Sequence, residues 1–411
     1  MIASLTVLVA VALSPALRAQ FLDGVTVEGA LISIQDGILA LETEDGPREL
    51  PLAQLQSIDF STNKESGTEA VTTWVELVDG SRLAAMSYET TARDALIQLA
   101  SGSQARIPLR AVRAIRFGPQ DELQQGAWER IRQGVGRIDR IAIRKQQEID
   151  YLEGVVQTID PEVVNFELDG EVLPVRITKI EGVVYGHRGP PDQPPAILRL
   201  STLDGSVVEA AEWSAGPDGV LVRTPAGLKV EYPYSGIRKI DFSLDKIVYL
   251  SQLEPVAVEW TPYIGVEGFG EILKRFYRPK KDRALARSRA GSDEGRLRVA
   301  NGGGAAANIE SYDRGISLHS RTRMIYKLPD GARRFHARAG IDASTRQSGH
   351  VRLVILGDGD ELFATEVSGR GGPRDISVDL TGVRLLELFV DYGENQDVGD
   401  HLNLCNARIV K

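Results

Sequence analysis

The chain has 411 residues, of which 42% are hydrophobic, 26% charged and 6% aromatic, and its formal net charge is −9. This composition is typical of a folded protein of several domains, and it excludes a disordered, collagen-like or polytopic membrane chain. The acidic balance gives no global field that would attract nucleic acid or anionic lipid, and the single cysteine, Cys405, excludes a disulfide framework.

Residues 1–19 have the pattern of a secretory signal peptide. A largely apolar run of about 12 residues after Met1 is too short to cross a bilayer as a stable helix but suits the core of a signal. Small residues allow cleavage after Ala16 or after Ala19. Because the first residues include no Lys or Arg, an uncleaved anchor and a plain buried segment remain alternatives. We expect an exported protein (periplasmic, cell-envelope or extracellular) with no membrane span once the signal is removed.

A repeat follows in the next 220 or so residues. A proline with apolar residues four, seven and nine positions later occurs at Pro51, Pro108 and Pro233, and a looser copy occurs at Pro174. Proline cannot donate to a ladder and suits the start or edge of a strand. Turn signals recur every 8–12 residues or so between alternating apolar segments, which indicates short antiparallel strands.

The repeat has a second level. Val27-Glu28-Gly29 resembles Leu152-Glu153-Gly154, and the second and fourth copies share an Asp-Gly hairpin, at 75–83 and 198–208. We therefore expect two duplicated all-β units at 24–118 and 138–243, each built from SH3-like barrels or hairpins and joined by a short helical connector at 119–137. Because the repeated positions are apolar, we interpret these units as spacers rather than as binding grooves.

The C-terminal domain, 245–411, shows longer strands with polar turns between them. An antiparallel β-sandwich is the expected fold, because helix-period apolar spacing is absent. A basic, glycine-rich loop is expected at about 274–308. It could hold an anionic polymer, but few aromatic residues interleave with its charges, which favours a solvated loop.

An ordered set of motifs carries a family resemblance in this domain. The motifs lie at 312–315 leading into 317–320, at 334–335 with 339–342, at 349–351 entering 357–359, at Leu362, at 378–379 with Gly382, at 388–391 and at Asp400-His401. Residues of about 249–411 resemble the novel putative carbohydrate-binding module (NPCBM) family, a jelly roll of the galactose-binding type. The resemblance implies a jelly-roll β-sandwich that binds a glycan or cell-envelope polysaccharide.

Two positions depart from the family pattern. Ser317 stands where the family usually has Gly before its His motif, and Leu404 stands where it has Trp. If that Trp normally stacks on a sugar ring, a stacking surface is lost. If it is a core residue, Leu404 replaces it with less volume, and the apolar terminal strand around it favours this second interpretation.

Sugar recognition needs planar apolar faces and carboxylate, amide or imidazole groups that bind hydroxyls. The candidate ligand-binding residues are His319, Asp342, Tyr392, Asp400 and His401. A buried His–Asp hydrogen bond that ties the first strand of the sandwich to the last would leave the same pattern in the sequence. Asp358 and Asp391 are turn residues by their chemistry.

The sequence gives weaker evidence for a metal site or a catalytic site. The histidines lack zinc spacing, and the turns at 357–360 and 394–397 are candidates for Ca²⁺ without EF-hand spacing, so the kind of metal site, if any, stays open. Nucleophile-elbow and Cys–His patterns are absent. We therefore expect no catalytic residues and no cofactor.

The leading hypothesis is an exported, non-catalytic protein that binds carbohydrate through its C-terminal domain. The alternative is a structural or assembly protein of the cell envelope whose β domains bind protein partners.

Overall fold

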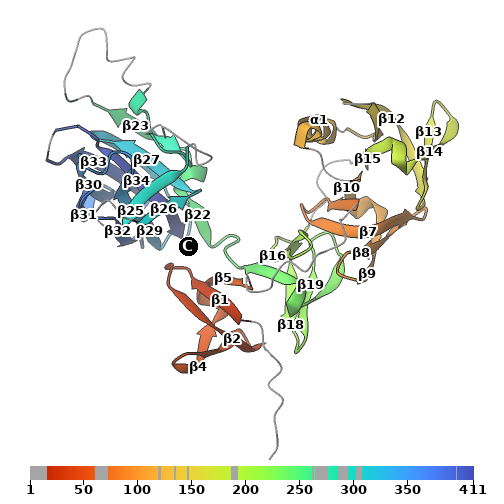
Figure 1. The fold of residues 1–411 in the computed structure, drawn as a ribbon, viewed down its shortest axis with the longest axis horizontal. Helices are drawn as coiled ribbons and strands as arrows, with labels where there is room; N and C mark the ends of the chain where they lie inside the picture. Colours follow the sequence, from red (N-terminus) through yellow and green to blue (C-terminus); the bar gives the residue numbers. More distant parts are fainter. Residues whose placement is uncertain are drawn as a thin grey trace, which may run out of the picture. The chain divides into compact units, whose positions relative to one another are not determined.

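The computed structural model describes residues 16–60, 73–118, 122–133, 136–145, 148–186, 193–261, 263, 276–285, 295–301, 308–394 and 396–411. The fold is nearly all-β, as predicted, and it divides into two compact units, Met1–Leu244 and Asp245–Lys411 (Figure 1). Within the described part of the chain, no helix has the length and apolar character needed to cross a membrane.

The first unit repeats one arrangement of short strands. Copy 1 has β1 (Ala16–Phe21), β2 (Thr26–Gln35), β3 (Ile38–Thr43), β4 (Gly46–Pro51) and β5 (Leu55–Asp59). Copy 2 has β6 (Thr73–Leu77), β7 (Arg82–Thr90), β8 (Asp94–Leu99), β9 (Gln104–Pro108) and β10 (Val112–Phe117). Copy 3 has β11 (Asp139–Lys145), β12 (Glu148–Ile159), β13 (Val163–Leu168), β14 (Glu171–Arg176) and β15 (Ile180–Val184). Copy 4 has β16 (Leu198–Thr202), β17 (Val207–Ala210), β18 (Glu212–Ala215), β19 (Gly219–Arg223), β20 (Lys229–Pro233) and β21 (Ile237–Asp241).

The proline motif marks the end of each copy. In copy 1, Pro51 ends β4 with a φ of −65°, a single 3-10 turn (Leu52–Gln54) follows, and β5 begins at Leu55. The apolar positions of the motif, Leu55, Ile58 and Phe60, have no exposed surface. The motif is therefore the turn into the last strand plus the core residues of that strand. In copy 3 the 3-10 turn (Ile177–Lys179) begins three residues after Pro174, which explains why that copy looks looser.

The last strands of the copies pair with one another. β5 of copy 1 lies antiparallel to β21 of copy 4, with Ile58 opposite Ile240. β10 of copy 2 lies antiparallel to β15 of copy 3, with Ile115 opposite Val183. Copies 1 and 4 therefore join through the same strand edges, and in the same register, as copies 2 and 3.

Copies 2 and 4 meet through their Asp-Gly hairpins in a reciprocal way. The Ala84 N–H donates to Ser206 Oγ at 2.9 Å, and the Glu209 N–H donates to Ser81 Oγ at 3.1 Å. Both serines are fully buried. Exchanging copies 1 and 2 for copies 3 and 4 reproduces the three junctions described above: copy 1 with copy 4, copy 2 with copy 3, and copy 2 with copy 4. This is the arrangement of a two-fold symmetric dimer joined into one chain.

One helix, α1 (Glu122–Gln133), lies in the predicted connector. Its Trp128 and Ile131 are buried against Ala114 and Val184, on the sheet formed by copies 2 and 3 (Figure 1). A Cβ at Gly182 would come within 2.7 Å of the Trp128 ring, so glycine is needed there.

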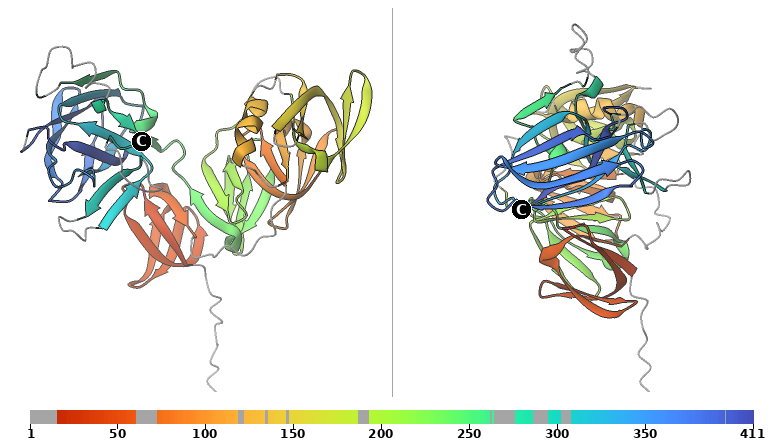
Figure 2. Two further views of the ribbon diagram at one scale, coloured as in Figure 1. Left: turned by 45° about the horizontal axis from the view of Figure 1, so that its top comes forward. Right: turned by 90° about the vertical axis from the view of Figure 1, so that its left-hand side faces the viewer.

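The start of the first unit differs from the prediction. β1 begins at Ala16, ahead of the expected boundary at residue 24, and pairs with both β2 and β5 (Figure 2). Its Leu17 and Ala19 are buried in the core of the unit. Residues 1–15 of the predicted signal lie outside the described part of the chain.

The second unit is an antiparallel β-sandwich. One sheet contains β22 (Ile247–Tyr249), β24 (Lys280–Lys281), β27 (Gly315–His319), β34 (His401–Val410), β29 (Arg334–Ile341) and β32 (Arg374–Asp379). The other contains β23 (Ala257–Trp260), β28 (Thr322–Lys327), β33 (Leu385–Tyr392), β30 (His350–Gly357) and β31 (Asp360–Ser368). A hairpin of β25 (Leu297–Asn301) and β26 (Asn308–Tyr312) completes the unit. The apolar core lies between the two sheets.

Two expectations for this unit are refined by the structure. The predicted loop at about 274–308 contains β24 and β25, and much of the remainder lies outside the described residues. Leu404 is fully buried in β34, so the departure from the family Trp changes the core rather than a binding surface.

Candidate functional site

The strand register of the sandwich brings two predicted histidines together. β27 and β34 run antiparallel with His319 directly opposite His401, and their ring centroids are 5.3 Å apart. His319 is 2% exposed, whereas His401 is half-buried. The first and last strands of the motif set are therefore neighbours, as closure of a jelly roll requires.

Two aromatic side chains that sequence reasoning missed pack on this pair. The Tyr277 ring lies 4.1 Å from the His319 ring and 6.3 Å from the His401 ring, centroid to centroid. The Trp260 ring, at the end of β23, lies 5.3 Å from Tyr277, and its Nε1 donates to the Ser320 carbonyl at 3.0 Å. We call these four residues, His319, His401, Tyr277 and Trp260, the imidazole–aromatic cluster.

Unpartnered polar atoms surround the cluster. Ser320 Oγ, Asp400 Oδ2 and His401 Nδ1 are buried, and none makes a hydrogen bond of normal geometry to the described residues. A hydrogen bond from the Ser320 hydroxyl nevertheless lowers the pKa of Asp400, so His401 Nδ1 is the atom of the three that has no partner of any kind among the described residues. The other oxygen of Asp400 accepts from the His350 N–H at 3.0 Å, which holds the carboxylate in place. Buried polar atoms without partners cost about 1–3 kcal/mol each, so their concentration here needs an explanation.

Burial sets the protonation states of the cluster. Loss of hydration, together with the neighbouring His319, lowers the pKa of His401 to about 4. Burial also lowers the pKa of His319, although the Ser320 carbonyl, 2.5 Å from its Nδ1, favours the charged form. Burial raises the pKa of Asp400 to about 6. Both imidazoles are therefore neutral at pH 7, and each then offers one donor and one acceptor nitrogen.

Tyr392 belongs to a second group beside the cluster. Its hydroxyl donates to the Thr261 carbonyl at 3.3 Å, and its ring meets the exposed Tyr263 edge-to-face at 5.1 Å. The guanidinium of the exposed Arg321 lies 5.8 Å from the Tyr392 ring centroid. Burial raises the pKa of the Tyr392 hydroxyl, which keeps it protonated as a donor.

Asp342 does not join the histidines as a free acceptor. Its Oδ2 accepts from Asn403 Nδ2 at 2.9 Å, and its Oδ1 accepts from the Ser344 N–H and hydroxyl at 3.0 and 2.6 Å. Ser317, the other position that departs from the family pattern, donates to Asn403 Oδ1 at 2.7 Å. With its oxygens used in this way, Asp342 holds the end of β29 to β34 and serves the fold.

The residues that the structure describes include no set of side chains arranged as metal ligands. They contain no group of three or more His, Cys, Asp or Glu side chains placed to hold a metal ion. In the first calcium candidate turn, the Asp358 carboxylate accepts from the N–H groups of Arg384 and Leu385, at 2.9–3.3 Å. The second candidate, 394–397, contains residue 395, which lies outside the described residues.

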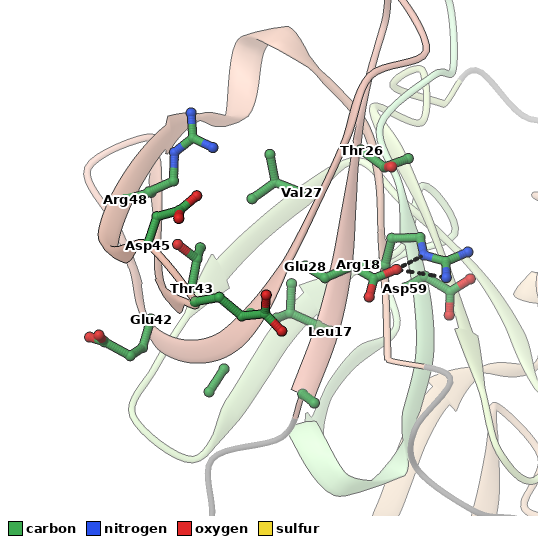
Figure 3. A pocket seen from close by; sticks show the side chains of 14 residues that line it. Leu17, Arg18, Thr26, Val27, Glu28, Glu42, Thr43, Asp45, Arg48 and Asp59 are labelled. Carbon is green, nitrogen blue, oxygen red and sulfur yellow. Dashed lines mark hydrogen bonds and ion pairs between the residues drawn. The ribbon is translucent and has the colours of Figure 1, made fainter.

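A surface hollow of about 610 Å³ lies in copy 1 of the first unit, lined by strands β1 to β5. Figure 3 shows Arg18 paired with Glu28 on one wall, while Glu42, Asp45 and Arg48 line the other. These side chains are exposed and hydrated. The hollow offers charges but neither an aromatic face nor a buried polar atom, so we place the candidate site in the second unit.

The missed residues had a weak signal in the sequence. Trp260 ends a short alternating segment, AVEW, and Tyr277 begins the segment YRPKKDR. The first segment pairs with β28 and not with a His-bearing strand, whereas the second contains β24, which pairs with β27. Only the folded sandwich brings them to the histidines.

The fold and the site together define an antiparallel β-sandwich module with an aromatic and polar cluster at one end of its strands. Residues 275–410 match the family model described as the NPCBM/NEW2 domain, which confirms the resemblance predicted from the sequence. The match covers the sandwich from residue 275 on; β22 and β23, with Trp260, and the repeats of the first unit precede it.

Solved carbohydrate-binding modules are similar to this chain at low identity. The CBM51 module of a Clostridium perfringens GH95 protein, solved in complex with methyl-galactose, is 20% identical with a TM-score of 0.32, covering 40% of this chain and 99% of that one. The tandem CBM51 modules of a family 98 glycoside hydrolase from Streptococcus pneumoniae are 12% identical with a TM-score of 0.32, covering 96% of this chain and 99% of that one. No curated protein matches the chain.

Proposed function

We propose that the second unit binds carbohydrate through the imidazole–aromatic cluster, in an exported and non-catalytic protein. The proposal is supported by the NPCBM/NEW2 match over the sandwich, whose name and whose solved relatives refer to sugar binding. The observation that supports it most is that the buried Nδ1 of His401, which has no hydrogen-bond partner among the described residues, and the buried Ser320–Asp400 pair lie beside the packed rings of Tyr277, His319 and Trp260.

A sugar matches this combination of groups. The apolar C–H face of a pyranose packs on an aromatic ring, while its hydroxyls bind planar polar groups beside that ring. Hydroxyls of a ligand that displaces the side chains covering these atoms would give His401 Nδ1 a partner, so binding would recover part of a cost already present in the free protein. Neutral imidazoles suit uncharged hydroxyls, because each ring presents both a donor and an acceptor.

A glycan array probed with the full-length mature protein tests the proposal. We expect retention of a limited set of glycans, and a loss of affinity of at least tenfold or so in Trp260→Ala, which removes the indole and its bond to the Ser320 carbonyl. Trp74→Ala is the matched control, because Trp74 is a half-buried tryptophan in the first unit, stacked on Arg82.

Melting curves of both variants separate binding from folding. Retained glycan affinity in a folded Trp260→Ala protein would reject the cluster as the site. Failure of the unaltered protein to retain any glycan would reject carbohydrate binding and favour the alternative of a cell-envelope assembly protein.

A further inference from the structure

A second hollow, of about 500 Å³, lies in the first unit where copies 1 and 4 meet. Copy 1 contributes the turn between β2 and β3 and the start of its 3-10 turn, and copy 4 contributes the strand β18. The hollow is lined by Ile34, Gln35, Asp36, Gly37, Leu52, Trp213, Ser214 and Ala215. We call it the Trp213 hollow.

The polar side chains that line the Trp213 hollow have no bonding partner among the described residues. Gln35, Asp36 and Ser214 are exposed, and no hydrogen bond or ion pair within the described residues holds their side chains. Trp213 is half-buried, and its ring is fixed by Phe242, whose centroid lies 5.5 Å away. An immobilised indole face therefore stands beside a free amide, a free carboxylate and a free hydroxyl.

Because the unit is internally two-fold, the junction of copies 1 and 4 can be compared with the junction of copies 2 and 3. By alignment of the Asp-Gly-Ser hairpins, Tyr88 of copy 2 corresponds to Trp213, and Thr90 corresponds to Ala215. Tyr88 is 2% exposed, and its hydroxyl lies 3.3 Å from the Tyr185 hydroxyl of copy 3. Thr90 Oγ1 accepts from the Ile159 N–H at 2.7 Å. The junction of copies 2 and 3 is therefore closed at the corresponding place.

The junction of copies 1 and 4 lacks both closing contacts. Phe60 corresponds to Tyr185 and has no hydroxyl, and Ala215 has no side-chain acceptor for the backbone N–H of Ile34. The two junctions share their strand pairing and register but differ in these side chains. The substitutions open a hollow and leave Trp213 accessible in one junction only.

We propose that the Trp213 hollow is a saccharide-binding site, separate from the imidazole–aromatic cluster, that takes one or two rings of a neutral glycan. Its volume is in the range of small-ligand sites, roughly 300–1,000 Å³. The indole face of Trp213 packs on the sugar ring, and Asp36 accepts from neighbouring hydroxyls. The Asp36 carboxylate disfavours an anionic sugar. On this proposal the repeats bind glycan themselves and are more than spacers.

The test uses the full-length mature protein carrying Trp260→Ala, which removes the cluster of the second unit from consideration. The probes are the linear hexaoses of glucose, xylose, mannose, galactose and N-acetylglucosamine, measured by saturation-transfer NMR. We expect at least one hexaose to receive saturation from the Trp260→Ala protein. Adding Trp213→Ala should abolish that signal, whereas adding Trp74→Ala should leave it unchanged.

Asp36→Asn provides a variant that spares the fold, because Asp36 is exposed and Asn tolerates its positive φ of 49°. We expect it to weaken hexaose binding about tenfold, since it replaces a charged acceptor by a neutral one. Absence of any hexaose signal from the Trp260→Ala protein would overturn the proposal. So would a signal that survives Trp213→Ala, or binding of an extended peptide at β18 with no hexaose binding.

Discussion

Asp400 and His401 are neighbours in the chain whose pKa values move in opposite directions for the same reason. Burial disfavours the charged form of each, so the acid becomes weaker and the base becomes weaker too. Both groups are consequently neutral over part of the acidic range. A neutral, desolvated pair suits recognition of uncharged hydroxyls.

The two shifts have opposite effects on the pH dependence of stability. Between about pH 4 and 6, folded Asp400 keeps a proton that the unfolded chain has released, so the free energy of unfolding falls as pH rises. Between about pH 4 and 6.5, the unfolded chain holds a proton that folded His401 lacks, so the free energy of unfolding rises with pH. His319, whose pKa is also lowered, acts in the direction of His401.

We predict that Asp400→Asn removes the part of the free energy of unfolding that falls as pH rises from about 4 to 6. Relative to the unaltered protein, the free energy of unfolding of the second unit should then gain on the order of 2 kcal/mol between pH 4 and pH 6. Denaturant titrations at several pH values across this window measure it. Parallel profiles for the two proteins would show that Asp400 does not titrate as the structure implies.

His401→Phe should separate stability from binding. Phenylalanine keeps a planar ring but removes the unpartnered Nδ1, so stability at pH 7 should stay equal or rise by about 1 kcal/mol, while glycan affinity falls at least tenfold or so. His336→Phe is the matched control, a buried histidine farther along the same sheet in β29 that has an interaction partner of its own. It should lower the melting temperature and leave binding intact. Reduced stability with unchanged glycan affinity in His401→Phe would assign His401 to the fold alone.

At the scale of elements, the first unit is organised by the edges of its last strands. A small barrel leaves the edge of that strand unpaired, and here each such edge is covered by the same edge of another copy. The Glu-Gly pairs seen in the sequence have a matching role in copies 1 and 3. Glu28 pairs with Arg18 across β1 and β2, and Glu153 pairs with Arg140 across β11 and β12.

A buried charge network holds one of the two last-strand junctions between the copies. In the junction of copies 2 and 3, the buried Glu181 accepts from Arg116 at 2.6 Å and from Arg144 at 2.8 Å. The corresponding faces of copies 1 and 4 carry Asp59 and Lys239 opposite one another, and α1 covers only the former junction. Duplication therefore preserved the strand pairing, while the side chains on its outer face diverged.

We predict equal destabilisation by Ser81→Ala and Ser206→Ala. Each removes the acceptor of one buried N–H, of Glu209 or of Ala84, which should cost about 1–3 kcal/mol in the free energy of unfolding of the first unit. Ser103→Ala, at a serine whose hydroxyl makes only a long 3.5 Å contact, serves as control. Chemical denaturation followed by tryptophan fluorescence gives the values. A large effect of one serine and none of the other would contradict the two-fold relation.

At the scale of the whole molecule, the two units have separate apolar cores, and the first begins within the predicted signal region. Removal of residues up to Ala19 would delete Leu17 and Ala19, both buried, and most of the strand that pairs with β2 and β5. Removal up to Ala16 would keep them. Of the two cleavage positions read from the sequence, the one after Ala16 is compatible with a complete first barrel.

We therefore predict that the exported protein begins at Leu17. Mass spectrometry of the protein purified from the cell envelope or the medium measures its N-terminus. A variant that starts at Gln20 should melt at a lower temperature in its first unit, because β1 is lost. An intact Met1 in a cytoplasmic fraction would contradict export.

The sequence alone determined the all-β class, the repeat and the family of the sandwich. These features depend on local patterns: prolines and turn glycines punctuate strands, alternating apolar residues set their faces, and the motif set of the sandwich follows the chain order. His319 and the Asp400-His401 pair could be predicted as neighbours, because they begin and end the same ordered set of strands.

Only the tertiary structure decided the rest. Trp260 and Tyr277 join the cluster from segments with no local signal, Asp342 is taken by Asn403 and Ser344, and Leu404 lies in the core. The pairing of copy 1 with copy 4, across about 180 residues, depends on strand edges that every copy presents alike. Local patterns specify which residues form an edge or a face, but which partner covers it depends on packing between distant segments.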